Sequence, residues 1–187
     1  MIAWLLCAIL AVCEPIPVSQ PVQPLTTTEA ATMAIAVPLV RQWEGMPCVG
    51  NRCEAYLDTI ANPPVWTICG GETEGVQPGE VRTLAQCEEG LRRGLIRYRN
   101  GLHRYFTAET IAVRLTPQRD AAFVSISWNI GIAGAGGSTA TRRLNAGDIV
   151  GACAALTWWN RSGNRVVRGL VNRRAAEHDL CMIGVAA

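Results

Sequence analysis

The sequence predicts an α+β fold, with a small strand-containing region in the N-terminal half and helices in the C-terminal half. Strands are indicated between residues 53 and 72, where AYLDTI and VWTICG are rich in β-branched and aromatic residues and flank Asn62-Pro63-Pro64. Helices are indicated from Thr83 onward, where apolar residues recur at steps of three and four. A chain of 187 residues is long enough to bury a core of its own.

The N-terminal segment, residues 1–24, is predicted to be an export leader followed by a linker, with one domain over residues 25–187. It begins with MIAWLLCAILAVC, thirteen residues without a charge. That stretch is shorter than the roughly 20 apolar residues that span a bilayer, and it is typical of a signal sequence. The segment Glu14–Pro24 is rich in proline, which blocks helix formation, so we expect an extended linker.

The first helix is predicted to begin at Thr26–Glu29, which has capping-box spacing, and to end near Glu44. Within it, Pro38 either kinks the helix or marks its true first turn. The apolar run Ala30–Val40 is predicted to be part of a core helix. Alternatively, this run extends the leader into a weak, releasable membrane anchor.

The later helices have clear start and stop signals. Thr83 and Gln86 form a second capping-box pair. Thr116-Pro117 places proline at the first position of a helix that ends at the Gly-rich GIAGAGG. Two short helices follow, the second capped by Asp148, and a loop, NRSGNRVVRG, leads to a last helix, LVNRRAAEHDLCM.

Cysteine content and charge restrict the class of protein. Eight cysteines favour disulfide bonds in an oxidising compartment. Their spacings are irregular and the two histidines are remote, so we predict no zinc site, and no other metal or organic cofactor is indicated. Residues 1–90 contain 3 arginines and 10 acidic residues, whereas residues 91–187 contain 14 and 5. The basic half either faces an anionic polymer, nucleic acid or cell wall, or is an ordinary solvated surface.

Three side chains are candidates for hydrolytic chemistry. Glu44 follows Trp43 at the end of a predicted helix, and a carboxyl beside an indole loses solvation, which suits a general acid. Asp58 lies in a polar strand-and-turn setting that suits a second carboxylate, and Thr67 offers a hydroxyl that could hold a water molecule. Glycoside hydrolysis requires two carboxyl groups in contrasting environments. Solvent-facing acids without a function would give the same pattern.

Further motifs resemble those of phage-type lysozymes, the endolysins of glycoside hydrolase family 24. The similar active-site run is E-G…A-Y-L-D…W-T-I-C-G-G-E-T-E-G-V. The second half adds W-N-x-G, then S-T-x-x-R-R-L-N-A-G-D, then G-L-x-x-R-R-x-x-E, so that the match covers roughly residues 35–183. The resemblance implies a lysozyme-like fold, in which a small β-hairpin-containing N-terminal lobe and a helical C-terminal lobe enclose a saccharide cleft.

The resemblance also implies roles for individual residues. It implies that Glu44 is the general acid, Asp58 the second carboxylate and Thr67 the hydroxyl that positions water. It further implies that Arg173 pairs with the catalytic glutamate; a surface pair with Glu177, four residues further along the helix, is the alternative, and both can hold.

Two further residues are placed near the substrate by the resemblance. Asn129, in W-N-I-G, is implied to line the cleft, and a helix C-terminal cap is the alternative. Glu72 stands where many family members have histidine. It either acts on Glu44 as a third nearby acid or caps the turn, and we favour the cap.

The chain departs from the family in the spacing of its acids. Fourteen positions separate Glu44 from Asp58, more than the family's commonest spacing, and the insertion is MPCVGNRC. A bond between its two cysteines would close a small ring that steadies the longer loop. Six cysteines allow fifteen pairings, and the resemblance together with nearness in sequence favours three. The expected disulfides are Cys48–Cys53, Cys69–Cys87 and Cys153–Cys181.

The implied partner is bacterial peptidoglycan, whose peptide carboxylates suit arginine. The arginines expected to face it are Arg142, Arg143, Arg161, Arg165, Arg168 and Arg174. Trp158 and Trp159 are candidates to stack on sugar rings, although we expect at least one of them to be buried. We expect a monomer that does not bind nucleic acid.

The implied function is that of an exported endolysin, acting in the periplasm or cell envelope of a bacterial host. It would hydrolyse the β-1,4 bond between N-acetylmuramic acid and N-acetylglucosamine and cause lysis, without a cofactor. Its N-terminal segment would associate transiently with the membrane. The alternative, favoured by the altered spacing of the acids, is a non-catalytic peptidoglycan-binding protein that retains the fold.

Overall fold

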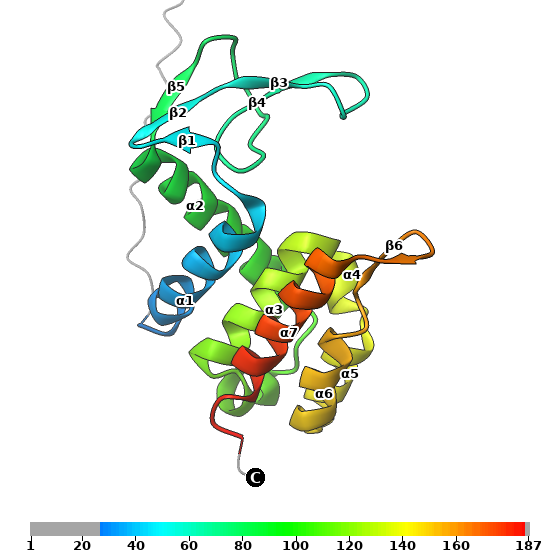
Figure 1. Cartoon of the computed structure of the whole chain (residues 1–187). Helices are drawn as coiled ribbons and strands as arrows, with labels where there is room; N and C mark the ends of the chain where they lie inside the picture. Colours follow the sequence, from blue (N-terminus) through cyan, green and yellow to red (C-terminus); the bar gives the residue numbers. More distant parts are fainter. Residues whose placement is uncertain (1–26, 186–187) are drawn as a thin grey trace, which may run out of the picture.

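The structure is a computed structural model that describes residues 27–185. Its strands β1 to β5 gather at one end of the molecule and helices α3 to α7 at the other, with α2 extending from one group to the other (Figure 1). This is the α+β arrangement that the sequence predicts. The expected leader and linker, together with Thr26 of the first expected cap, lie outside the described residues.

Helix α1 (Thr27–Glu44) is the first predicted helix. It buries Met33 and Val40 against α2 and α3, so the interpretation of this apolar run as a core helix is confirmed. The helix continues through Pro38, which rules out a first turn at that residue. Pro38 and Ala34 are exposed, so the carbonyl that proline leaves without a donor can be hydrated. Across residues 27–185, no helix combines the length and apolarity that a bilayer crossing requires.

Two small antiparallel sheets form the N-terminal lobe. β1 (Cys48–Val49), β2 (Arg52–Glu54) and β5 (Val81–Thr83) form a three-stranded sheet in the order β1-β2-β5. β3 (Tyr56–Asp58) pairs with β4 (Val65–Thr67), and these are the two strands that the sequence predicts. The other three strands of this lobe were not predicted, because they do not lie in longer runs rich in β-branched and aromatic residues such as AYLDTI and VWTICG.

Helix α2 (Leu84–His103) begins at the predicted capping box. The backbone N–H of Gln86 donates to Thr83 Oγ1 over 3.2 Å, and the backbone N–H of Thr83 donates to Gln86 Oε1 over 2.8 Å. Two of the donors at the start of the helix are therefore satisfied locally. The helix extends from the sheet region to the helical lobe (Figure 1). Its side chains contribute to the cores of both, Cys87 at one end and Leu102 at the other.

Helix α3 (Pro117–Ile130) is the centre of the helical lobe. It begins where Thr116-Pro117 predicts, and Thr116 Oγ1 accepts from the backbone N–H of Arg119 over 3.2 Å. All residues from 119 to 127 are buried, because α1, α2 and α7 (Arg168–Met182) pack around it. It ends at Gly131, whose φ of +85° lies in the left-handed region that glycine adopts easily.

The remaining elements between α2 and α7 in the sequence are short. They are η1 (Thr110–Arg114, a π-helical turn), α4 (Ile132–Gly136), α5 (Thr139–Asn145), α6 (Ile149–Leu156), β6 (Arg161–Ser162) and β7 (Arg165–Val166). The two short helices α5 and α6 are predicted, and Asp148 caps the second through Gly151 N–H over 2.8 Å. The glycine-rich stop contains a helix, α4, and the expected loop contains a hairpin, β6–β7. Both expectations of irregular backbone at these places were therefore wrong.

Candidate active site

Glu44 is the last residue of α1 and lies where the two lobes meet. The chain turns sharply after it at Gly45, which has a φ of +64°. The segment that follows β4 packs on this turn, since a Cβ at Gly70 would lie 3.5 Å from Glu44 Cβ and 3.4 Å from the carbonyl oxygen of Gly45. Glu44 keeps 26% of its side-chain surface exposed, so it is held by its surroundings and still reachable by a ligand.

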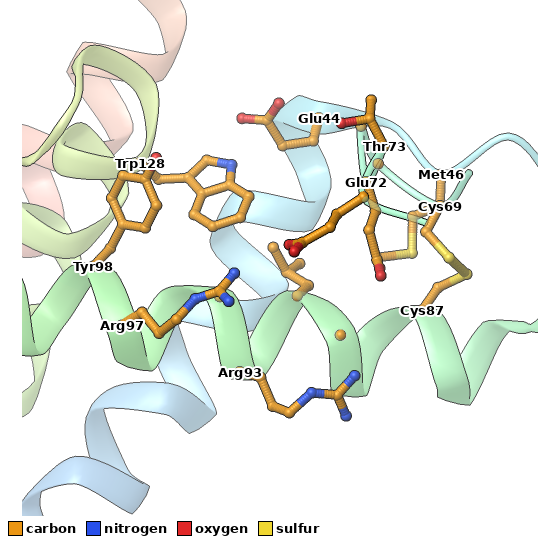
Figure 2. A pocket seen from close by; sticks show the side chains of 16 residues that line it. Glu44, Met46, Cys69, Glu72, Thr73, Cys87, Arg93, Arg97, Tyr98 and Trp128 are labelled. Atoms are coloured by element: carbon orange, nitrogen blue, oxygen red, sulfur yellow. A yellow bond between two sulfur atoms is a disulfide. The ribbon is translucent and has the colours of Figure 1, made fainter. Parts of the chain in front are cut away.

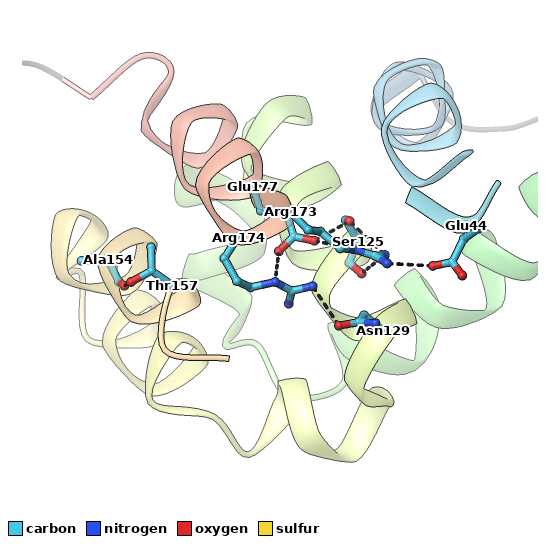
Figure 3. A network of polar contacts seen from close by, with 8 residues as sticks. All are labelled: Glu44, Ser125, Asn129, Ala154, Thr157, Arg173, Arg174 and Glu177. Carbon is cyan, nitrogen blue, oxygen red and sulfur yellow. Dashed lines mark hydrogen bonds and ion pairs between the residues drawn. The ribbon is translucent and has the colours of Figure 1, made fainter. Parts of the chain in front are cut away.

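Arg173 of α7 fixes the Glu44 carboxylate. Its Nη1 donates to Glu44 Oε1 over 2.7 Å (Figure 3). The same guanidinium donates through Nε to Glu177 Oε1 over 3.2 Å and through Nη2 to the carbonyl oxygen of Ser125 over 3.2 Å. Both contacts expected of Arg173 are therefore present in one side chain. The pair with Glu177 is buried, however, and the expectation of a surface pair was wrong.

Glu177 is the buried centre of this network. It accepts a hydrogen bond from Ser125 Oγ over 2.6 Å and forms an ion pair with Arg174 over 3.1 Å. Burial raises the pKa of Glu177, while the neighbouring Arg174, Ser125 and Arg173 oppose that rise. The acceptors around Arg173 come from α1, α3 and α7, so its orientation depends on the packing of three helices.

A pocket of about 740 Å³ opens beside Glu44. Its walls include Glu72, which follows β4, and Arg97, Tyr98 and Trp128 from α2 and α3 (Figure 2). The volume is within the range of pockets that hold small ligands. The structure therefore provides a ligand-sized space that contains the expected general acid.

Glu72 shares this pocket with Glu44, and its side chain pairs with an arginine instead of capping the turn. Its side chain forms an ion pair with Arg82 of β5 over 2.8 Å, while its backbone exchanges hydrogen bonds with Ile68. The Glu72 carboxylate, hydrogen-bonded to that guanidinium, raises the pKa of Arg82. No hydrogen bond from a backbone N–H to the Glu72 side chain is present in the described part of the chain, so the favoured role as a turn cap was wrong.

Asp58 and Thr67 lie on the β3–β4 hairpin, not on the walls of the pocket. Tyr56 is paired with Thr67 and Asp58 with Val65, so Asp58 and Thr67 are diagonal neighbours on one face of the ribbon. Asp58 Oδ1 accepts from the backbone N–H of Ile60 over 2.9 Å, which fixes its side chain at the end of the strand. Thr67 is buried, and its hydroxyl donates to the carbonyl oxygen of Val65 over 3.3 Å.

Asn129 belongs to the same polar network as Glu44. Its Oδ1 accepts from Arg174 Nη2 over 2.9 Å (Figure 3). Helix α3 ends at Ile130 with Gly131 as its cap, so the alternative in which Asn129 is the C-terminal cap was wrong. Asn129 is exposed and is not among the residues that line the pocket beside Glu44.

Comparison with known proteins identifies this arrangement. The family model described as "Phage lysozyme" matches residues 41–177. The chain belongs to the phage lysozyme family. It is therefore a glycoside hydrolase of the lysozyme type, an endolysin that acts on peptidoglycan. A SAR-endolysin of Bacteriophage PS119 is 33% identical over 136 residues, which cover 72% of this chain and 77% of that protein.

Solved structures of lysozymes share the fold of this endolysin. The endolysin from Escherichia coli O157:H7 phage FAHEc1 superimposes with a TM-score of 0.65 and 27% identity, over 88% of this chain and 96% of that chain. The muramidase domain of SpmX from Asticaccaulis excentricus gives a TM-score of 0.64 and 26% identity, over 79% and 94%. The lysozyme-like fold implied by the sequence motifs is thus confirmed.

Three disulfide bonds hold this lysozyme together in the described residues. They are Cys48–Cys53, Cys69–Cys87 and Cys153–Cys181, the pairs that the family resemblance implied. The first joins β1 to β2, the second joins the segment that follows β4 to α2, and the third joins α6 to α7. The sulfur atoms of Cys48, Cys53 and Cys87 lie within 4.8 Å of one another, but as disulfide sulfurs they offer no thiolate to a metal ion.

The arginines expected to face peptidoglycan do not all reach the surface of the lysozyme. Arg174 is completely buried in the Glu177 network, so its assignment to that surface was wrong. Trp158 and Trp159 are 57% and 39% exposed, which contradicts the expectation that one of them is buried. Arg143 lies over the Trp158 ring, 5.3 Å from its centroid, and so forms a cation–π contact.

Sequence reasoning missed several residues of the lysozyme pocket. Four residues that line it were not proposed as site residues: Arg93, Arg97, Tyr98 and Trp128. One signal was available for the two arginines, since they lie four positions apart on a predicted helix and therefore share a face. No local signal could have placed that face beside Glu44, because this depends on how α2 packs against α1 and α3.

Proposed function

We propose that this endolysin hydrolyses the β-1,4 bond between N-acetylmuramic acid and N-acetylglucosamine with Glu44 as general acid. The observation that carries the proposal is the position of Glu44, which lies in the pocket and is held by Arg173 over 2.7 Å. A general acid must be fixed within hydrogen-bonding reach of the oxygen that it protonates. One oxygen of Glu44 is engaged by Arg173, and the other remains for the glycosidic oxygen.

Asp58 is proposed as the second carboxylate and Thr67 as the residue that positions water. The diagonal placement of the two side chains on one face of β3–β4 supports their acting together. The segment that follows β4 reaches Glu44 at Gly70, which supports approach of this hairpin to the acid. A carboxylate on the opposite side of the sugar ring from the acid is what activated water requires in an inverting hydrolase.

Export is proposed to depend on residues 1–24, which would associate transiently with the membrane and deliver a monomer to the periplasm. The three disulfide bonds support an oxidising compartment. If this is right, the full chain expressed in a bacterium should clear the culture, whereas the chain lacking residues 1–24 should stay in the cytoplasm and cause no lysis. Lysis by the shortened chain would contradict the proposed role of the leader.

Glu44→Gln tests the catalytic assignment. The variant should lose at least about 100-fold in the rate at which purified protein clears a peptidoglycan suspension, because proton donation contributes roughly 10²–10⁴-fold. It should still bind peptidoglycan in a pull-down assay. The control is Glu88→Gln, whose side chain pairs with Arg41 on an exposed face outside the pocket. Equal clearing by wild type and Glu44→Gln would contradict the assignment, and no clearing by either would favour the non-catalytic alternative.

A further inference from the structure

The α2 wall of the pocket carries two arginines without strong partners. Arg93 and Arg97 lie one turn apart and both are exposed (Figure 2). Within residues 27–185, Arg97 forms no ion pair, and Arg93 forms a long one of 3.7 Å with Glu89, a pair that is largely exposed. Such an exposed pair contributes little, so both guanidinium groups are available to a ligand.

The acids in the pocket do not neutralise these arginines. Glu44 is paired with Arg173, and Glu72 with Arg82, both on other elements. Glu74 also lines the pocket but has no ion pair with Arg93 or Arg97 among the described residues. The α2 wall therefore presents positive charge toward the space beside the proposed general acid.

An aromatic surface adjoins this charge. Trp128 and Tyr98 lie with ring centroids 4.9 Å apart, and Arg97 extends from α2 toward the Trp128 indole (Figure 2). Trp128 can approach the helix because residue 94 is glycine, since a Cβ there would lie 2.8 Å from the indole. Glycine within a helix costs about 1 kcal/mol relative to alanine, and here it leaves the room that the ring occupies.

The ligand chemistry follows from the charge of peptidoglycan. Its two sugars are uncharged once the lactyl group of N-acetylmuramic acid is joined to a peptide through an amide bond. The carboxylates of the substrate then belong to the peptide stem. A guanidinium fork binds a carboxylate through two parallel hydrogen bonds, and an indole offers an apolar face to a sugar ring.

We propose that Arg97, with Arg93 beside it, binds a carboxylate of the peptide stem while the sugar that carries the stem packs against Trp128. This rests on the proposed function and adds a determinant of substrate specificity to it. The enzyme would accordingly prefer glycan strands that carry stems with free carboxylates.

Arg97→Gln tests the proposal on soluble, uncrosslinked glycan strands that carry N-acetylated stem peptides. The variant should lose about tenfold in kcat/KM through a higher KM with little change in kcat, as expected when a charge-assisted contact that only binds substrate is removed. Converting the stem carboxylates to amides should cause a similar loss in the wild type and no further loss in the variant. Additive losses would show that Arg97 and the carboxylates act independently, and would overturn the proposal.

Two controls separate stem recognition from other effects. Arg92→Gln alters an arginine on the same helix that pairs with Glu89 and lines a different groove, and it should leave KM unchanged. Strands whose stems have been removed by an amidase, and whose freed lactyl carboxylates have then been converted to amides, should be cleaved equally by wild type and Arg97→Gln. An equal loss on stripped strands, or an equal loss in Arg92→Gln, would overturn the proposal. The proposed function itself fails if Glu44→Gln remains active or if the wild type clears no peptidoglycan, and neither result depends on Arg97, so the two failures are distinguishable.

Discussion

Arg173 of α7 and Glu44 of α1 meet across 129 positions of sequence, with Nη1 and Oε1 2.7 Å apart. The Arg173 side chain is 5% exposed, and its guanidinium is held by two further acceptors, Glu177 Oε1 and the Ser125 carbonyl oxygen. The carboxylate of the proposed acid is therefore oriented by a side chain whose own direction is fixed by the helical lobe. The position of Glu44 is thus tied to the packing of the two lobes.

Arg173→Lys should separate charge from geometry in this contact. A lysine ammonium is a point charge and cannot donate in three fixed directions to Glu44, Glu177 and Ser125. We expect kcat/KM for peptidoglycan to fall at least about tenfold, and the free energy of unfolding to fall by about 1–3 kcal/mol because buried acceptors lose a donor. Clearing assays and urea denaturation measure the two effects. Unchanged activity in the variant would show that Glu44 does not depend on this fork.

Asp120 is a second buried contact point, where α1, α2 and α3 meet. Its carboxylate accepts from Arg99 Nε over 2.5 Å and from Thr32 Oγ1 over 3.0 Å, and lies 2.8 Å from His103 Nε2. Breaking such a buried charge pair leaves its partner uncompensated. Asp120→Asn should therefore lower the free energy of unfolding at pH 7 by about 3–5 kcal/mol. A loss below about 1 kcal/mol in urea denaturation would contradict a stabilising role for the ion pair between Asp120 and Arg99.

The same residue predicts how stability depends on pH. Burial acts to raise the pKa of Asp120, but His103 and Arg99 outweigh burial and lower it overall. A carboxyl with a lowered pKa in the folded state stabilises the protein above its unfolded pKa of about 3.9, and this contribution is lost as the pH falls below that value. The wild type should therefore lose more stability than Asp120→Asn between about pH 5 and pH 3. Parallel pH profiles from denaturation would contradict this explanation.

The disulfide bonds should differ in their contribution to stability. Cys153–Cys181 closes a loop with a sequence separation of 28, and Cys48–Cys53 one of 5. A longer loop leaves the reduced unfolded chain more freedom, so replacing the first pair by alanine should cost about 3–4 kcal/mol and the second about 2 kcal/mol. Thermal and urea denaturation of the two double variants measure the difference. An equal or reversed order would show that loop length does not decide the contribution.

Gly94→Ala should change activity through Trp128. The added Cβ would lie 2.8 Å from the indole, so the ring must move within the pocket. Alanine favours a helix over glycine by about 1 kcal/mol, which offsets part of the cost of that shift. We expect a small net change in stability and a several-fold loss of kcat/KM. The matched control is Gly169→Ala on α7, where a Cβ would meet no atom within 4 Å; it should leave activity unchanged.

Helix boundaries in this protein follow from local chemistry. Three helix starts depend on hydrogen bonds between residues three positions apart, so the sequence alone predicts them. They are the capping box of Thr83 and Gln86, the cap at Thr116 and the cap at Asp148. The strands β3 and β4 were predictable for the same reason, because residue type and a proline-containing turn mark them locally. The motifs shared with phage lysozymes were sufficient to predict the family and the two contacts of Arg173.

Tertiary structure decided which of these residues share a site. The strands β1, β2 and β5 lie outside the residue runs that mark β3 and β4, and they form a sheet by pairing with one another. Glu72 contacts Arg82 only because β5 returns to this lobe. Arg174 and Arg97 are the same residue type in the same basic half, yet one is buried in a network and the other lines the pocket. Helical spacing determines which residues share a face, but only the packing of α2, α3 and α7 determines what that face meets.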